Sequence, residues 1–137
     1  MVKNLEREGA TTGTVGPHVS REIYVFPEVK KEIFDKLLTM LESPDKSRND
    51  IFQEVKKISD IIGIKNYKQI FVNKNKPFDQ KKGPFSIVSF GNYAGGDLIV
   101  ENLIFSTKFR AVHFPGNLLR YCDSKRISGN KYSLIFV

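Results

Sequence analysis

The sequence predicts an α+β fold in which two helices near the N-terminus pack on a β-sheet. Three observations indicate this fold. Apolar residues recur at helical spacing in the first half, short β-rich runs fill the second half, and turns containing Gly or Asn separate those runs. With 137 residues, 40% hydrophobic and 27% charged, the chain suits a single globular domain. Helices followed by strands favour helices that cover one sheet of a barrel or jelly roll.

The first half of the chain contains the helical signals. Residues 1–20 are polar and rich in Gly and Thr, so we expect a flexible tail there and one domain over residues 21–137. A short strand is expected over residues 21–26, because a run of β-branched and aromatic residues ends before a proline. Residues 27–43 and 50–64 each place apolar side chains on one helical face, which predicts two amphipathic helices. Asp50 and Gln53 resemble a capping box at the start of the second helix, and Gly63 is expected just beyond its end.

The second half is expected to form a sheet of short strands. The pair Gly95-Gly96 predicts a turn with positive φ between two of them. The five β-rich runs are 67–73, 85–91, 97–102, 109–114 and 131–137.

Charge and cysteine content narrow the class of protein. The net charge of +7 favours an anionic partner, either nucleic acid or an acidic protein surface. A single cysteine, Cys122, excludes an intramolecular disulfide and favours a reducing compartment. The first twenty residues hold no apolar stretch that would serve as a signal peptide or membrane anchor. We therefore expect an intracellular protein, in the cytoplasm or the nucleus, with no membrane partner.

Four motifs in the second half suggest a family. They occur in order over about half of the chain as VNKN (72–75), GPFSIVSFGNYAGGDL (83–98), HFPGN (113–117) and GNKYSLIFV (129–137). This series resembles the 2-oxoglutarate- and Fe(II)-dependent dioxygenases, in particular the short branch of fungi, algae and large viruses related to nucleic-acid base oxygenases. The resemblance implies a minimal double-stranded β-helix, a jelly-roll-like core, with the two helices packed on it.

The iron ligands of that family do not follow the same pattern here. The family holds iron with a His-x-Asp motif and a distal His, the two imidazoles and one carboxylate typical of these oxygenases. The chain has only His18 and His113, and neither opens a His-x-Asp. Where the resemblance places the motif, Asp79 remains as a carboxylate without the histidine. Arg120 or Tyr121 stands where the distal His is expected.

The cosubstrate residue also differs. The family's closing Arg binds the carboxylate of 2-oxoglutarate, and the matching residue here is Lys131, which lacks the bidentate fork of a guanidinium. The resemblance therefore implies a vestigial site of Asp79, Tyr121 and Lys131, with no catalytic residues and no bound Fe(II) or 2-oxoglutarate.

A basic segment spans residues 65–82, from the start of the first β-rich run to the turn before the second. Six lysines fall within eighteen residues that contain one acid, Asp79, and Tyr67, Phe71 and Phe78 are interleaved with them. Cations that neutralise phosphates, together with aromatic rings that stack on bases, are typical of a nucleic-acid groove. An ordinary lysine-rich surface, or an edge strand protected by charge, explains the same pattern. The candidate nucleic-acid-binding residues are Lys65, Lys68, Lys74, Lys76, Lys81, Lys82 and, from a second basic cluster in the later strands, Arg120.

Three hypotheses for the function follow. The first is a catalytically inactive dioxygenase-like domain that binds nucleic acid within a larger assembly. The second is a structural subunit of the same fold that binds another protein. The third is an active dioxygenase with an atypical metal site that includes Asp79 or His113. Salt-dependent binding of nucleic acid separates the first from the second, and iron content after anaerobic loading separates the third from both.

Overall fold

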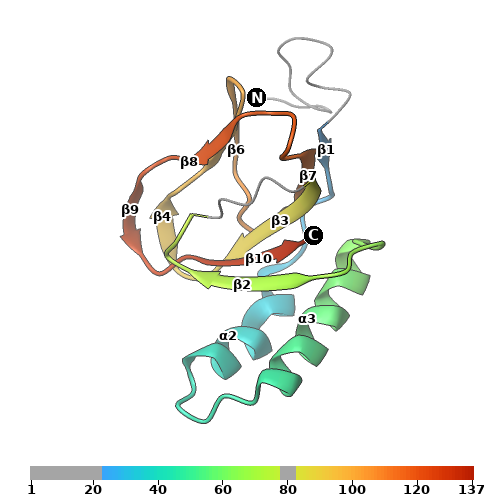
Figure 1. The fold of residues 1–137 in the computed structure, drawn as a ribbon. Helices are drawn as coiled ribbons and strands as arrows, with labels where there is room; N and C mark the ends of the chain where they lie inside the picture. The colour runs from blue at the N-terminus through green and yellow to red at the C-terminus, as the bar shows by residue number, and fades with distance from the viewer. Residues whose placement is uncertain (1–22, 78–82) are drawn as a thin grey trace.

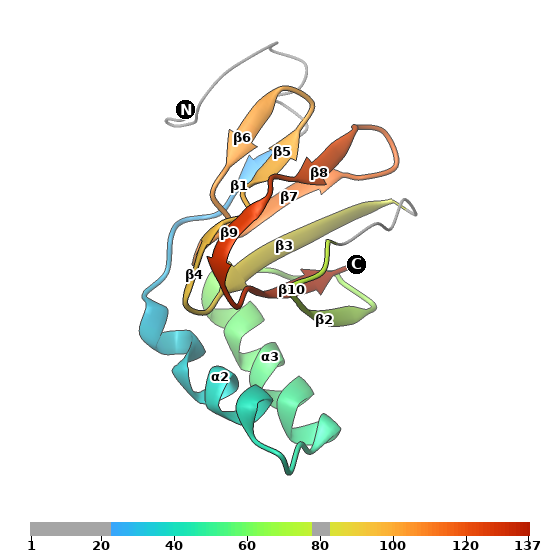
Figure 2. The ribbon, with the colours of Figure 1, turned by 90° about the vertical axis from the view of Figure 1, so that its left-hand side faces the viewer.

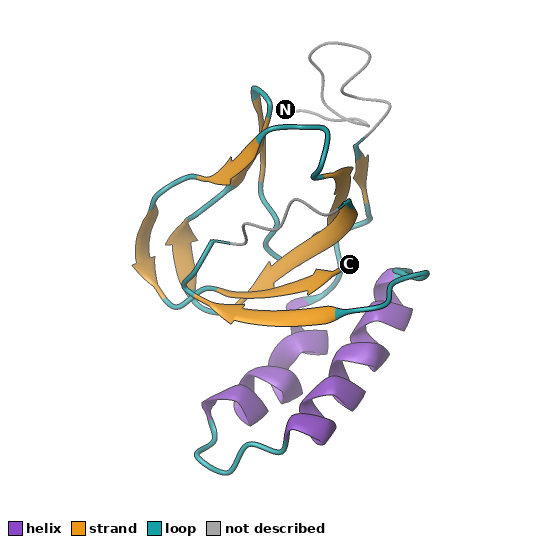
Figure 3. Ribbon diagram, viewed as in Figure 1, coloured by secondary structure: helices purple, strands orange, loops and turns teal. Residues whose placement is uncertain are grey.

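The computed structural model describes residues 23–77 and 83–137, and it has an α+β fold (Figure 1). The helices lie together at one end and the strands form the rest of the molecule (Figure 3). The expected tail over 1–20, and the start of the expected strand at 21–26, fall outside the described residues; only β1 (Tyr24–Val25) is seen of that strand. None of the helices in the described part of the chain is long and apolar enough to cross a membrane.

The two helices contain the predicted apolar stripes, but each begins at a different residue than predicted. A 3₁₀ turn, η1 (Lys31–Phe34), leads into α2 (Asp35–Glu42), and α3 (Arg48–Ile62) follows. The first helix starts later than predicted because Val29 is tied in an extended segment, where its amide donates to the carbonyl of Phe109.

The second helix keeps its predicted end but not its predicted cap. Gly63 follows α3 with φ 98°, the left-handed conformation expected of a C-terminal glycine. The predicted capping box at Asp50 and Gln53 is wrong: the helix begins one turn earlier, and the hydroxyl of Ser47 accepts from the Asp50 amide at 3.3 Å.

The helices cover one face of a five-stranded antiparallel sheet with the order β1-β7-β3-β10-β2. Strand alternation places Val88, Phe90, Leu134 and Phe136 on the helix side, where they form a core with residues of α2 and α3. The Phe90 ring stacks on Phe34 with their centroids 4.9 Å apart. The strands that complete this sheet are β2 (Ile70–Lys74), β3 (Pro84–Phe90), β7 (Val112–Pro115) and β10 (Tyr132–Phe136).

Two smaller antiparallel sheets lie against the other face of the five-stranded sheet (Figure 2). A second core of Phe85, Ile87, Val112, Phe114 and Ile135 packs there against Leu98 and Val100 of the three-stranded sheet. None of the three sheets closes on itself. One small sheet pairs β4 (Tyr93–Gly95) with β9 (Arg126–Gly129), and the other has the order β6 (Leu103–Phe105), β5 (Leu98–Val100), β8 (Tyr121–Asp123).

The five predicted β-rich runs all contain strands, but they account for only half of the sheet structure. The run at 85–91 matches β3 within one residue, whereas the run at 109–114 is strand only from Val112 because Phe109 has φ 62°. Gly95 and Gly96 have positive φ as predicted and link β4 to β5, which lie in different sheets.

Candidate nucleic-acid interface and interior polar cluster

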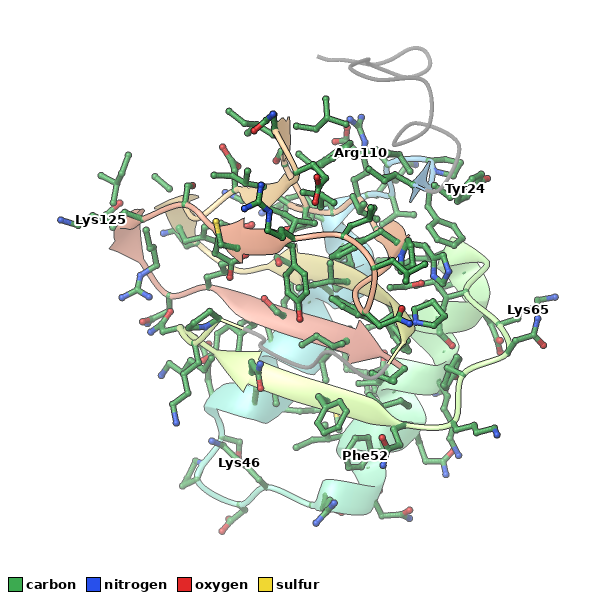
Figure 4. All side chains as sticks on the ribbon, turned by 45° about the horizontal axis from the view of Figure 1, so that its top comes forward. Tyr24, Lys46, Phe52, Lys65, Arg110 and Lys125 are labelled. Carbon is green, nitrogen blue, oxygen red and sulfur yellow. The ribbon has the colours of Figure 1, made fainter. Side chains whose placement is uncertain are left out.

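Four of the lysines predicted to line a nucleic-acid groove lie before or after the central part of β2. Lys65 and Lys68 precede the strand, Lys74 ends it, and Lys76 follows it. All four side chains are exposed. Since five extended residues span about 13 to 17 Å, the strand separates the two pairs. Figure 4 shows Lys65 on the opposite side of the sheets from Lys125.

The two aromatic residues among these lysines that the structure describes, Tyr67 and Phe71, are half-buried, and each packs on one of the two cores. Tyr67 donates to or accepts from the Ser59 hydroxyl at 2.9 Å, and its ring meets Phe136 edge-on at 5.0 Å. Phe71 points to the other face of β2 and packs on the second core. Strand alternation explains the position of Phe71, whereas Tyr67 precedes β2 and is held by its contacts with Ser59 and Phe136.

The far end of β2 meets a second basic segment. The Asn75 side chain accepts from the Lys131 amide at 2.7 Å and donates to the Asn130 side chain at 3.0 Å, which joins the end of β2 to the β9–β10 turn. Lys125 and Arg126, both exposed, stand at the start of β9. We call the four exposed cations Lys74, Lys76, Lys125 and Arg126 the basic corner; Figure 1 draws the end of β2 beside the turn between β9 and β10.

The remaining predicted cations are Lys81, Lys82 and Arg120. Lys81 and Lys82, like Asp79, lie outside the described residues. Arg120 is exposed but precedes β8 in the three-stranded sheet, where its amide donates to the Glu101 carboxylate at 2.6 Å.

Lys131 is buried between the sheets and its ammonium group has partners within the chain. It donates to the Gly96 carbonyl at 2.6 Å and lies 3.7 Å from the Asp123 carboxylate. Burial raises the pKa of Asp123, and the nearby Lys131 ammonium opposes that rise. The tight approach is possible because Gly96 has φ 69° and no side chain, and a Cβ there would lie 3.3 Å from the Lys131 side chain.

A group of hydroxyls lies on the same face of the five-stranded sheet. Ser89 contacts Ser133 at 3.0 Å and accepts from Thr107 at 2.9 Å, and all three side chains are buried. Burial raises the pKa of Tyr93 to about 12, with hydrogen bonds to Ser89 and Thr107 opposing the rise. The Lys108 ammonium sits 4.7 Å from the centre of the Tyr93 ring. These polar groups satisfy one another in the interior.

The other residues considered at the sequence level lie apart from this cluster. His113 accepts or donates through Nδ1 to the Ser86 hydroxyl at 2.8 Å, and strand alternation places it on the opposite face of β7 from Val112 and Phe114. Tyr121 packs edge-on against Phe85, with ring centroids 5.3 Å apart. Within residues 23–77 and 83–137, His, Cys, Asp and Glu side chains form no group of three or more that would hold a metal ion.

No model of a known protein family matches the chain, and no curated protein matches it. The residues that sequence analysis missed are Asp123 and Tyr93, because nothing local indicates that they meet Lys131. The sequence also did not predict β9. In this strand Ile127 and Gly129 alternate with polar residues, but so short a pattern occurs in turns as well as in strands.

Proposed function

We propose that the chain is a catalytically inactive dioxygenase-like domain that binds nucleic acid through the basic corner, within a larger assembly. Its fold is then a minimal double-stranded β-helix. The path of the chain supports this fold: it runs from β3 in the large sheet to β4–β6 in the small sheets, returns to β7, leaves to β8 and β9, and ends in β10. Strands that alternate between two layers in this way are what a helix of strands requires.

The surroundings of Lys131 support the inactive state. The resemblance places the cosubstrate-binding cation at this position, yet its ammonium donates to the Gly96 carbonyl and faces the Asp123 carboxylate. A buried cation that is neutralised from within has little capacity left for an external dicarboxylate. His113, on the other face of the sheet, is poorly placed to take part in an atypical metal site there.

The observation that carries the binding proposal is that two exposed cationic segments belong to strands that are joined at their ends. Lys74 and Lys76 come from the end of β2, Lys125 and Arg126 from the start of β9, and the contact between Asn75 and Asn130 joins the end of β2 to the end of β9. The carboxylate of Asp123 faces Lys131 and is therefore already paired within the chain. With Tyr67 and Phe71 turned inward, the affinity comes from phosphate contacts and is largely independent of base sequence.

The test is binding of labelled DNA and RNA, single- and double-stranded, at several salt concentrations. Replacing all four residues of the basic corner by Ala lowers the affinity for every sequence. It also makes the salt slope shallower by about 0.9 per lost phosphate contact on duplex DNA. The control variant replaces Lys30, Lys31, Lys46 and Lys56, which are exposed on the helical side, and changes the net charge equally. Equal effects of the two variants, or no binding at low salt, would reject the proposal.

A protein-binding role is the second candidate, and one observation favours it. Ile104, Ile99 and Cys122 lie in register across β6, β5 and β8, on the outer face of the three-stranded sheet. Ile104 is 65% exposed. An exposed apolar row of this kind is typical of a protein contact. Replacing Ile104 by Thr would weaken capture of a protein partner and leave nucleic-acid binding unchanged.

A further inference from the structure

We infer that the partner is duplex DNA and that Ile127 inserts between its base pairs as an apolar wedge. This inference rests on the proposed function, since the same basic corner holds the phosphates. It adds the kind of nucleic acid and the residue that contacts the bases.

The first observation is the exposure of the Ile127 side chain at a β-bulge. In the β4–β9 pair, Ala94 faces Ser128 and Gly95 faces Arg126, so Ile127 is the extra residue of a β-bulge. Its side chain is 79% exposed, more than that of any other large apolar residue in the described part of the chain. Bulges re-aim a side chain, and here the bulge directs an apolar group into solvent.

The second observation is that the bulge is held firmly in place. Gly95 has φ 77°, and a Cβ at that position would lie 2.7 Å from the Lys125 carbonyl oxygen and 2.8 Å from the Ile127 amide nitrogen. The Gly96 amide donates to the Lys125 carbonyl at 3.1 Å. A wedge that separates stacked bases has to resist the force of restacking, so a fixed backbone is needed beneath it.

The third observation is the charge beside the wedge. Lys125 and Arg126 directly precede Ile127, and both are exposed. A lone exposed isoleucine is ordinary on a protein surface. Ile127, however, projects from a two-stranded ribbon directly after two cations, which is the arrangement of a protein that binds a DNA groove. The cations contact the phosphates on either side of the step that the apolar side chain opens.

The fourth observation favours a duplex over a single strand. Proteins that bind single strands stack the bases on exposed aromatic rings. Among residues 23–77 and 83–137, Tyr24 is the one aromatic residue that is largely exposed. It lies on β1, at the opposite edge of the five-stranded sheet from β2. Near the basic corner, Ile127 is therefore the residue that contacts the bases. Its branched aliphatic side chain can separate two stacked base pairs, but it cannot stack on a single base as an aromatic ring does.

The experiment uses the full chain and a DNA duplex with 2-aminopurine beside a central TA step, because such steps open readily. At saturating protein we expect the 2-aminopurine fluorescence to rise as the base unstacks. Ile127→Thr keeps a β-branched residue in the bulge, and we expect it to abolish that rise and to weaken duplex binding roughly five- to tenfold. Ile104→Thr, the matched control on another small sheet, leaves both measurements unchanged. The salt slope stays the same in both variants because no cation is lost.

The outcomes separate the wedge from the function on which it rests. Duplex binding without a rise in fluorescence, equal effects of the two isoleucine variants, or tighter binding to a single strand would overturn the wedge and leave the nucleic-acid proposal standing. Absence of binding to any nucleic acid at low salt would overturn both. Binding to vesicles of anionic lipid that depends on Ile127, with no binding to DNA, would reassign the wedge to a membrane surface.

Discussion

Replacing Lys131 by Met tests the ion pair that Lys131 forms with Asp123 between the sheets. The ammonium lies 3.7 Å from the Asp123 carboxylate, and the two side chains are 8% and 20% exposed. At an effective dielectric constant of about 20, this attraction is roughly 4 kcal/mol, and the charged hydrogen bond to Gly96 adds about 2 kcal/mol. The cost of desolvating both ions offsets much of this sum. We therefore expect Lys131→Met to lower the free energy of unfolding by about 3 kcal/mol at neutral pH, because it leaves the Asp123 carboxylate buried without a counter-charge.

The assay is urea denaturation of four proteins: the wild type, Lys131→Met, Asp123→Asn and the double variant. We expect the double variant to be more stable than the sum of the single losses predicts, by about 1 to 2 kcal/mol, because its buried carboxylate is gone. As the pH falls, Lys131→Met regains more stability than the wild type, since its Asp123 has lost the ammonium that opposes the rise of the pKa and then becomes protonated and neutral. A loss below about 0.5 kcal/mol for Lys131→Met, together with strict additivity, would show that the two groups do not compensate each other.

Three further predictions concern the backbone, the core and pH. Gly95→Ala is expected to cost about 3 kcal/mol in thermal or urea unfolding because its Cβ meets the backbone of β9, whereas Gly63→Ala, with nothing within 4 Å, costs about 1 kcal/mol; similar losses would contradict this. Phe90→Ala is expected to cost about 3 to 5 kcal/mol by loss of the ring stacked between Phe34 and Tyr132, and a loss under about 1 kcal/mol would mean that the core refills the cavity. Burial lowers the pKa of His113, so the unfolded chain binds its proton first, and stability falls as the pH drops below about 6.5; His113→Phe flattens that part of the pH profile, and an unchanged profile would assign the loss to other groups.

The sequence predicts the α+β class and the central strands because their signals are local. The apolar stripe through Val55 and Ile58 makes α3 recognisable without knowledge of the fold, and the run that becomes β3 is apolar along its whole length. The ends of the helices were less predictable, since Ser47 and Asp50 both have side chains that cap helices and only the backbone decides between them.

The candidate site was predictable only in part, because its geometry depends on contacts between distant segments. Exposure of Lys74 and Lys76 follows from their charge. The joining of their segment to the end of β9 depends on the contact of Asn75 with Asn130, for which the sequence has no signal. The same limit applies to the aromatic residues, since an alternating run does not say which of its faces are covered until the sheets are assembled.

The place of β10 beside the central strand β3 has a consequence for how the protein folds. This strand lies between β2 and β3 and is paired with both along its whole length. Its partners in β2 lie roughly sixty positions earlier in the chain, so the pairing closes a long loop before it gains any stabilisation. The helices and the short hairpin of β5 and β6 can form from near neighbours, but β2 has no partner in the large sheet until β10, the last strand, has formed. We expect folding to be slow for a domain of this size, with a partly ordered helical intermediate whose unpaired strands are prone to association with other chains.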